Sequence, residues 1–231
     1  MRIRGERECQ HCGTRWSYYE TGSITCPECE SPVSVGVGER TEHTDAPVEF
    51  DLTPVRRAVD EVPLREVAER AADRAGEYVR KTGFVNAGDL QPLPDAYLAA
   101  AELRQVGSQI AGGLRVDDPV ELYFLELLRG ADAGERPDVD DVPASIQAAR
   151  GRAVASSVAA VQSDLRRIVT DPEHRVSQVL STLTTHRKRV EALDGDVSPR
   201  EAERLVRTVR DLLAYLREDD ETALVRAQDR L

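Results

Sequence analysis

Residues 9–29 decide the fold of the amino-terminal region, and they read CQHCGTRWSYYETGSITCPEC. All four cysteines of the chain lie in this stretch, as two C-x2-C pairs separated by thirteen residues. A two-residue gap lets both thiolates of a pair, here called a knuckle, point at one ion about 2.3 Å away, and four such sulfurs surround it tetrahedrally. The spacing therefore predicts one structural Zn²⁺ ion, with the ligands Cys9, Cys12, Cys26 and Cys29.

The segment between the knuckles has the composition of a hairpin. Residues 14–19 are strand-like, and residues 20–23 favour a turn. Gly13 follows the first knuckle, where the chain often needs a positive φ. We therefore expect one hairpin to hold the two knuckles together, tighter than in ribbons whose spacer has about 15–20 residues.

Other uses of paired cysteines fit the sequence less well. Two disulfides require an oxidising compartment, and the charged amino terminus MRIRGERECQ lacks the apolar core of a secretory signal. A redox C-x2-C of the thioredoxin type needs a βαβ context, which the sequence does not predict. Rubredoxin-type iron sites use similar knuckles, but a considerably longer segment separates them. His11 lies inside the first knuckle and is expected to face solvent, because four cysteines already complete the ligand set.

Residues 7–33 resemble the zinc ribbon of the archaeal and eukaryotic transcription factor B family (TFIIB type). The matching residues are Cys9, Cys12, Gly13, Cys26, Pro27 and Cys29. The likeness ends there, because no tandem pair of cyclin-like repeats follows residue 40. The whole chain more closely resembles a haloarchaeal protein family that joins a TFIIB-type ribbon to a helical remainder. This resemblance implies a ribbon and helices, and it assigns no activity.

The charge balance is a second indication of origin. The 231 residues include 31 Lys and Arg against 42 Asp and Glu, for a formal net charge of −11. Only two of the basic residues, Lys81 and Lys188, are lysines. Dense carboxylates keep a surface hydrated and repulsive where molar salt screens charge within about 3 Å. We therefore favour a halophilic protein over a GC-rich genome as the explanation. No apolar run approaches the roughly 20 residues that span a bilayer, so we expect a cytoplasmic protein without membrane contact.

The rest of the chain is expected to be mainly α, after an acidic linker at residues 39–52. Proline is favoured in the first turn of a helix, because its missing N–H would have no partner there. Seven prolines are placed to start helices: Pro54, Pro63, Pro94, Pro119, Pro143, Pro172 and Pro199. Four of them follow an expected N-cap residue: Thr53, Asp118, Asp171 and Ser198.

The predicted fold is thus mainly α with a small N-terminal β zinc ribbon. Its expected domains are a ribbon at 1–38, a helical region at 53–129, an acidic loop or linker at 130–142 and a three-helix antiparallel bundle at 143–231. Three apolar stripes define this bundle: Val154 to Ile168, Val176 to Leu193 and Leu205 to Leu216. Short joints make the three helices antiparallel, as a helical bundle or a coiled-coil hairpin. An exposed stripe would bind a partner or form a homo-oligomer.

Motifs of known catalytic sites do not occur in the sequence. There is no Walker A sequence, no HExxH and no nucleophile elbow around a serine. Gly36 and Gly38 lack the third glycine of a phosphate-binding loop and predict a turn. His186 falls on the apolar seam between Leu183 and Val190, where we expect a partly buried side chain rather than a catalytic base. We therefore predict that the chain is not an enzyme.

Two functions remain, and both involve the ribbon. Trp16 and Tyr18 could stack on nucleic acid, or they could simply cover the zinc site in a domain too small for another core. Nearby basic residues are Arg2, Arg4, Arg7 and Arg15. Ribbon glutamates offset these charges, and phosphate binding weakens steeply with salt. We therefore expect a non-catalytic adaptor that docks on a protein partner, with the transcription machinery as one candidate. The alternative is a nucleic-acid-binding regulator that uses Arg15, Trp16 and Tyr18.

Overall fold

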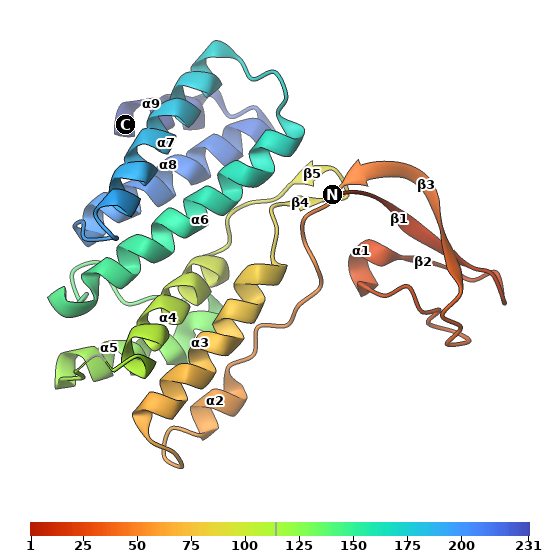
Figure 1. Ribbon diagram of the computed structural model, residues 1–231. Coiled ribbons are helices and arrows are strands. Elements are labelled where there is room, and N and C mark those ends of the chain that lie inside the picture. Colours follow the sequence, from red (N-terminus) through yellow and green to blue (C-terminus); the bar gives the residue numbers. More distant parts are fainter. Residues whose placement is uncertain (114) are drawn as a thin grey trace.

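The computed structural model describes residues 1–113 and 115–231, and it places a small amino-terminal sheet beside a helical body (Figure 1). The central strand β1 (Arg2–Cys9) pairs antiparallel with β2 (Arg15–Ser17) and with β3 (Ser34–Glu42), in the order β2-β1-β3. A single helical turn, α1 (Tyr18–Thr21), follows β2. Because β1 runs away from the body, Cys9 lies at the far end of the sheet (Figure 1).

The body consists of helices with short connections. The helices are α2 (Thr53–Arg57), α3 (Leu64–Lys81), α4 (Asp95–Ala111), α5 (Asp118–Gly130), α6 (Gln147–Ile168), α7 (His174–Ala192), α8 (Pro199–Glu218) and α9 (Glu221–Arg230). Between them lie the strands β4 (Val85–Asn86) and β5 (Asp89–Leu90) and the 3-10 turns η1 (Ala131–Ala133) and η2 (Ala144–Ile146). The prediction of a mainly α chain with a small amino-terminal sheet is confirmed.

Proline placement agrees with the observed helix starts. Each of the seven prolines singled out above lies within two residues of the first residue of a helical segment. Ser198 caps α8 as expected, because its Oγ accepts a hydrogen bond from the Glu201 N–H at 3.2 Å. This bond satisfies one of the amide groups that the first turn of a helix leaves without a partner.

The other three expected caps are wrong by one or two residues. Asp117, not Asp118, caps α5, and its carboxylate accepts a hydrogen bond from an N–H of the first turn at 3.1 Å. α2 begins at Thr53, so this residue lies inside the helix, and α7 follows Glu173 rather than Asp171. The cap is the residue at which the backbone leaves its extended conformation, and composition alone does not fix that position.

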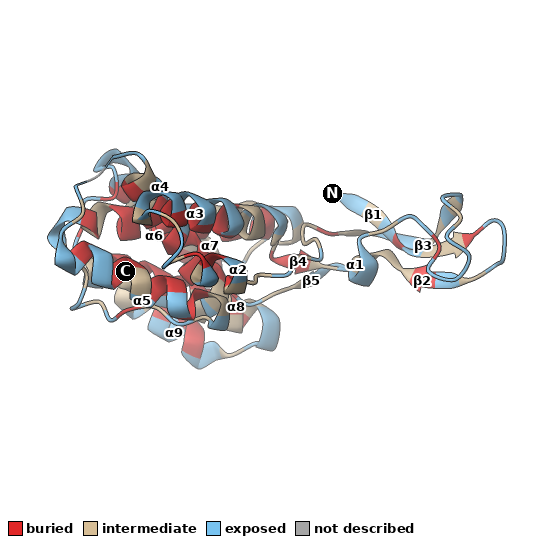
Figure 2. Ribbon diagram, turned by 90° about the horizontal axis from the view of Figure 1, so that it is seen from below, coloured by how far each residue is buried: buried red, intermediate tan, exposed pale blue. Residues whose placement is uncertain are grey.

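Apolar side chains fill two neighbouring cores inside the body. Figure 2 shows many buried residues along the helices of the body and few in the ribbon. One core lies among α6, α7, α8 and α9 and includes Phe84 and Tyr97 from the earlier helical region. The other lies among α2, α3, α4 and α5 and includes Ile146 and Ala149 from the later region. α4 packs against both α3 and α6. The two helical regions therefore share their packing, and α4 joins the two cores.

Of the two segments between the predicted domains, the first differs from expectation and the second agrees with it. β3 runs to Glu42, so the sheet takes up the first four residues of the expected linker at 39–52. Pairing with β1 overrides the acidic composition of these residues. The segment 130–142 is a loop, one of the two forms expected for it, and it packs on the body, since it contains η1 and a largely buried Arg136 side chain. That side chain forms ion pairs with Glu102 and Glu203.

Residues 143–231 are all described, and they hold the four helices α6 to α9 rather than three. α8 ends where Asp219 adopts a left-handed conformation with φ 55°. The carboxylate of Asp220 then accepts hydrogen bonds from two N–H groups of the next turn, which starts α9. His186 is half-buried on α7, as expected. Leu193 departs from its predicted stripe and is exposed, because α7 ends at Ala192.

The ribbon meets the body at Asp164 of α6. This buried carboxylate accepts hydrogen bonds from Thr44 Oγ1 at 2.6 Å and from the Phe84 N–H at 2.8 Å. The Thr44 N–H also donates to the Val85 carbonyl at 2.9 Å. The backbone of Gly83 passes so close to Thr44 that a Cβ at position 83 would lie 2.3 Å from the Thr44 carbonyl carbon. These contacts fix the root of the ribbon to α6 and β4.

Candidate metal centre

Four sulfurs gather at the far end of the ribbon. The Sγ atoms of Cys9, Cys12, Cys26 and Cys29 all lie within 4.8 Å of one another. The Cys9–Cys29 and Cys12–Cys26 Sγ distances are both 3.6 Å. A tetrahedron with metal–sulfur bonds of about 2.3 Å has sulfur–sulfur edges of about 3.8 Å, whereas a disulfide bond is about 2.05 Å long. The four predicted ligands are therefore brought together at a spacing that suits one metal ion.

Each of the two knuckles contains the same kind of backbone turn. The Gly13 N–H donates to the Cys9 carbonyl and the Glu30 N–H donates to the Cys26 carbonyl, each at 3.1 Å. Both donors are left-handed, with φ 77° at Gly13 and 56° at Glu30. The glycine made the first turn predictable, but Glu30 gave no such indication. His11 is exposed, as expected, and it contributes only its backbone N–H, which donates to Cys9 Sγ at 3.4 Å.

The hairpin predicted between the knuckles is wrong. β2 pairs with β1 instead, with Trp16 opposite Arg7, so the first knuckle is itself the turn of a hairpin. Only Arg15–Ser17 of the expected strand at 14–19 is extended, and Tyr18 begins α1. The physical reason is the length of the strand available for pairing. β1 has eight residues and pairs along both of its edges, whereas the thirteen-residue spacer could form only shorter strands if it folded back on itself.

The thiols have strongly different pKa values. Hydrogen bonds to the hydroxyl and N–H of Thr14 lower the pKa of Cys12 to about 6. The Ser31 N–H acts to lower the pKa of Cys29, but the neighbouring thiols and burial outweigh it and raise that pKa to about 12. Each thiolate makes it harder for the next thiol to lose its proton, so all four ionise together only around a cation. Four thiolates suit zinc or iron, and they leave no protein ligand of another kind at the site.

Trp16 is the centre of the small ribbon core. It is 8% exposed and packs with Cys9 and Cys26. Its indole Nε1 donates to the Ser23 carbonyl at 3.0 Å. The indole therefore covers the cysteine cluster and uses its own donor inside the ribbon, which is the structural role weighed above.

The other two predicted contact residues lie elsewhere. Arg15 Nη2 forms an ion pair with Glu8 Oε2 at 2.6 Å. Tyr18 is half-buried at the start of α1, where it lines a cavity beside β1. Arg15, Trp16 and Tyr18 thus have three different surroundings: an ion pair, the cysteine cluster and a cavity wall.

One family model matches the entire chain, residues 1–231, and it describes a family of unknown function (DUF7117). The chain belongs to this family. No curated protein matches the chain, and no solved structure matches it either. DUF7117 membership names no activity, so function must be argued from the site itself. Within the described residues, no helix is long and apolar enough to cross a membrane.

An apolar patch on the DUF7117 ribbon, formed by Val33 and Val35, escapes prediction from the sequence. These side chains are 59% and 43% exposed. Successive side chains of a strand point to opposite faces, so Ser34, whose Oγ donates to the Ile24 carbonyl at 2.5 Å, lies on the other face of β3, with Arg7 and the exposed Ile24. The patch was missed because the glycines at 36 and 38 predicted a turn, whereas both lie inside β3. A strand prediction for residues 33–37 would have revealed the alternating valines.

Proposed function

We propose that the chain is a non-catalytic adaptor whose metal-stabilised ribbon docks on a protein partner. The observation that carries the proposal is the apolar patch of Val33 and Val35, on a ribbon that projects from the body (Figure 1). In the described body, exposed large apolar side chains occur singly, at Leu122, Leu193 and Val225. Exposed apolar residues that group on one small unit are typical of protein-binding surfaces, whereas scattered ones are normal.

We infer that the bound metal is Zn²⁺ and that its role is structural. Four protein thiolates would fill a tetrahedral coordination sphere and leave no position for water or substrate. The apolar core of the ribbon, Trp16 with Cys9 and Cys26, is too small to stabilise three strands alone. Elemental analysis of the purified protein should find one zinc ion per chain. Iron in its place would contradict the assignment of the metal as zinc.

The cellular setting follows from composition and from the knuckles. A net charge of −11 with only two lysines supports a halophile. The likeness of residues 7–33 to TFIIB-type ribbons makes the transcription machinery of its cytoplasm the first candidate partner. The helical body would act as a rigid support. Most apolar stripe residues of α6, α7 and α8 are buried in its core, so a homo-oligomer would need another surface.

The alternative function, a nucleic-acid-binding regulator, is less well supported. Base stacking requires an accessible aromatic face. Trp16 is buried and Arg15 is ion-paired with Glu8, which leaves Tyr18 alone of the three predicted contacts. The adaptor is therefore the better proposal.

Affinity capture from a native high-salt lysate, treated with nuclease, tests this function. The intact chain should retain a protein partner. The variant Val33→Ser/Val35→Ser should lose the partner while keeping its bound metal and its helical circular dichroism. Val225→Ser is the matched control, because Val225 is 45% exposed on α9, and it should capture normally. Equal capture by both variants, or material that disappears with nuclease, would overturn the proposal.

A further inference from the structure

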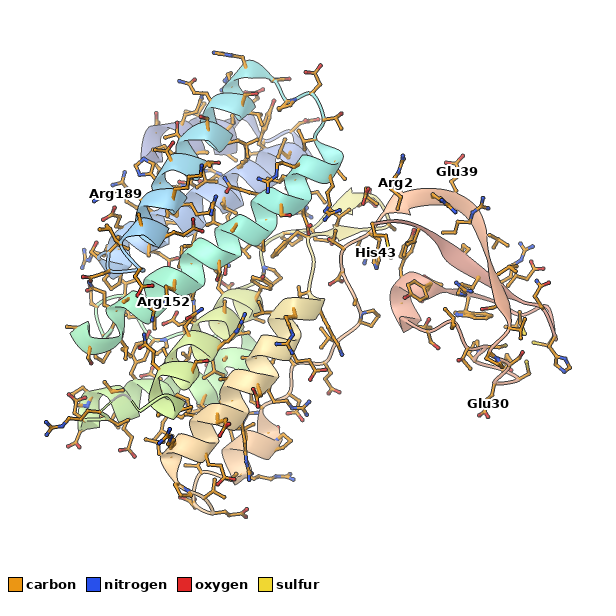
Figure 3. The ribbon with its side chains drawn as sticks, viewed as in Figure 1. Arg2, Glu30, Glu39, His43, Arg152 and Arg189 are labelled. Carbon is orange, nitrogen blue, oxygen red and sulfur yellow. The ribbon has the colours of Figure 1, made fainter. Side chains whose placement is uncertain are left out.

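A concave surface lined by arginines lies on the face of the ribbon sheet opposite the apolar patch. Its cavity has a volume of about 510 Å³ and sits against β1 and β3. The side chains that matter for its chemistry are Arg2, Arg4, Arg7, Arg40, Tyr18 and Ile24. Figure 3 shows Arg2 at the root of the ribbon, with Glu30 at its far end. Two exposed apolar side chains, Met1 and Ile24, also line this cavity.

Two of these arginines face each other across the sheet. A bulge between Arg4 and Glu6, with Gly38 at φ 79°, shifts the register of β3 so that Arg40 lies directly opposite Arg4. Like charges in directly opposed positions destabilise a sheet. A bound anion between the two guanidinium groups would reverse that effect. Two directly opposed arginines are therefore expected where a bound anion neutralises their charges.

The arginines of this surface form no close ion pair among the described residues, although Arg2 lies opposite Glu42 in the sheet. Among the described residues, no carboxylate lies within the 4.0 Å ion-pair distance of Arg2, Arg4, Arg7 or Arg40. The contrast with the body is clear, since the chain has 42 acidic residues. Arg136, Arg150 and Arg200 each pair with a carboxylate there.

One of these arginines, Arg7, is also held in place. Arg7 Nε donates to Ser34 Oγ at 2.9 Å and Arg7 Nη2 donates to the Ser34 carbonyl at 3.0 Å, which leaves Nη1 for a ligand. Gly36 gives Arg4 room, because a Cβ at position 36 would lie 3.0 Å from Arg4 Cβ. Side chains that are already ordered lose less entropy when they bind.

We propose that this arginine surface binds the carboxylates of an acidic segment in a partner protein. The inference rests on the proposed docking function, and it adds the chemistry of the partner: Asp or Glu next to apolar side chains. Guanidinium groups form bidentate hydrogen bonds with carboxylates, more directionally than lysine does. Met1 and Ile24, which line the same cavity, accept the flanking apolar residues.

A protein segment fits this surface better than a nucleic acid. A continuous phosphate backbone would extend beyond the cavity and meet the exposed carboxylates of Glu6 and Glu39, which repel it. A short acidic segment places its charges only over the arginines. Trp16, the largest aromatic side chain of the ribbon, is buried and cannot stack on a base.

Selection from a random peptide library, with the intact metal-loaded chain as bait, tests the inference. The retained peptides should be enriched in Asp and Glu beside apolar residues. They should bind Arg4→Gln/Arg40→Gln more weakly, on the order of tenfold or more. The matched control Arg57→Gln/Arg65→Gln changes two exposed arginines of α2 and α3 and should bind normally. The first variant should also be at least as heat-stable as wild type, because it removes the like-charge pair.

The outcomes separate this inference from the proposed docking function. Peptides without acidic enrichment, or equal binding to Arg4→Gln/Arg40→Gln, would overturn the inference. If those peptides still failed to bind Val33→Ser/Val35→Ser, docking through the patch would stand. Acidic peptides that need the arginines but not the valines would keep the inference and remove the patch from the docking surface. Retention of no peptide at all would count against both, and arginine-dependent binding of oligo-thymidylate instead would replace the acidic segment with nucleic acid.

Discussion

The ribbon and the helical body differ in what holds them together. The buried apolar cluster of the ribbon consists of Cys9, Trp16 and Cys26. The body buries two large cores, with side chains such as Phe84 and Phe124 fully inside. Burial of apolar surface stabilises by about 25 cal/mol per Å², so the body has a hydrophobic source of stability that the ribbon lacks. We therefore expect the ribbon to depend on the proposed metal ion for its stability, whereas the body folds around its apolar side chains.

Loss of one metal ligand should give the largest effect. We expect Cys26→Ser to unfold the ribbon, because metal binding and folding are linked and structural zinc contributes on the order of 10 kcal/mol or more. The fluorescence of Trp16, the single tryptophan of the chain, should shift to the red. Far-ultraviolet circular dichroism should keep most of its helical signal. Disappearance of the helical signal as well would show that ribbon and body form one folding unit.

The second prediction concerns a buried charge network that spans both cores of the body. Arg150 on α6 is 3% exposed and pairs with Glu102 on α4, which is fully buried. The hydroxyl of Tyr123 also donates to Glu102. Arg150→Met leaves the Glu102 carboxylate buried with a weaker set of partners, and we expect a loss of about 3–5 kcal/mol in urea unfolding.

Arg166→Met is the control for this network. Arg166 lies on the same helix, is exposed and should change stability by less than about 0.5 kcal/mol. Similar effects of the two substitutions would mean that the network adds nothing to the body. Trp16 fluorescence should stay native in both variants at low urea, because the ribbon does not contain these residues.

A third prediction compares two helical glycines of the body. A Cβ at Gly151 of α6 would lie 2.0 Å from the Gly195 carbonyl oxygen, which is backbone and cannot move aside easily. We expect Gly151→Ala to lower the free energy of unfolding by about 1–3 kcal/mol. At Gly76 of α3 the nearest atoms are the flexible ends of Arg80 and Arg104. Gly76→Ala should therefore stabilise by about 0.4–1 kcal/mol, and thermal unfolding of both variants would reveal opposite signs.

The smallest effect is expected at the boundary between the two regions. Burial lowers the pKa of His43 below its usual value of 6.5, and its ring packs on Tyr19 with centroids 4.5 Å apart. The unfolded chain then takes up a proton more readily than the folded chain. Stability therefore falls as the pH drops through the unfolded value toward the lower folded value. In His43→Phe this loss between about pH 7.5 and pH 6 should shrink, as measured by urea unfolding, and an unchanged pH dependence would contradict the assignment.

The sequence predicts the parts of this molecule that depend on local spacing. The two C-x2-C pairs identify all four sulfurs of the cluster, and prolines such as Pro94 and Pro199 mark helix starts correctly. Both features work because metal ligation and helix initiation depend on residues a few positions apart.

The remaining features depend on residues far apart in the chain. The register that brings Arg40 opposite Arg4 depends on a bulge at Gly38, and the ion pair between Glu102 and Arg150 joins α4 to α6. Neither arrangement has a local pattern. Strand β3 was missed because its acidic end resembled a linker, although pairing with β1 decides its conformation. The same holds for Asp117, which caps α5 one residue before the expected position.

Hydrogen exchange read out peptide by peptide, before and after removal of the metal with a chelator, tests the contrast between ribbon and body most directly. The account predicts that residues 2–42 lose their protection when the metal is removed, while α3, α4, α6 and α8 keep theirs. Protection lost throughout the chain, or a ribbon that stays protected without metal, would contradict the claim that the ribbon depends on the metal and the body does not.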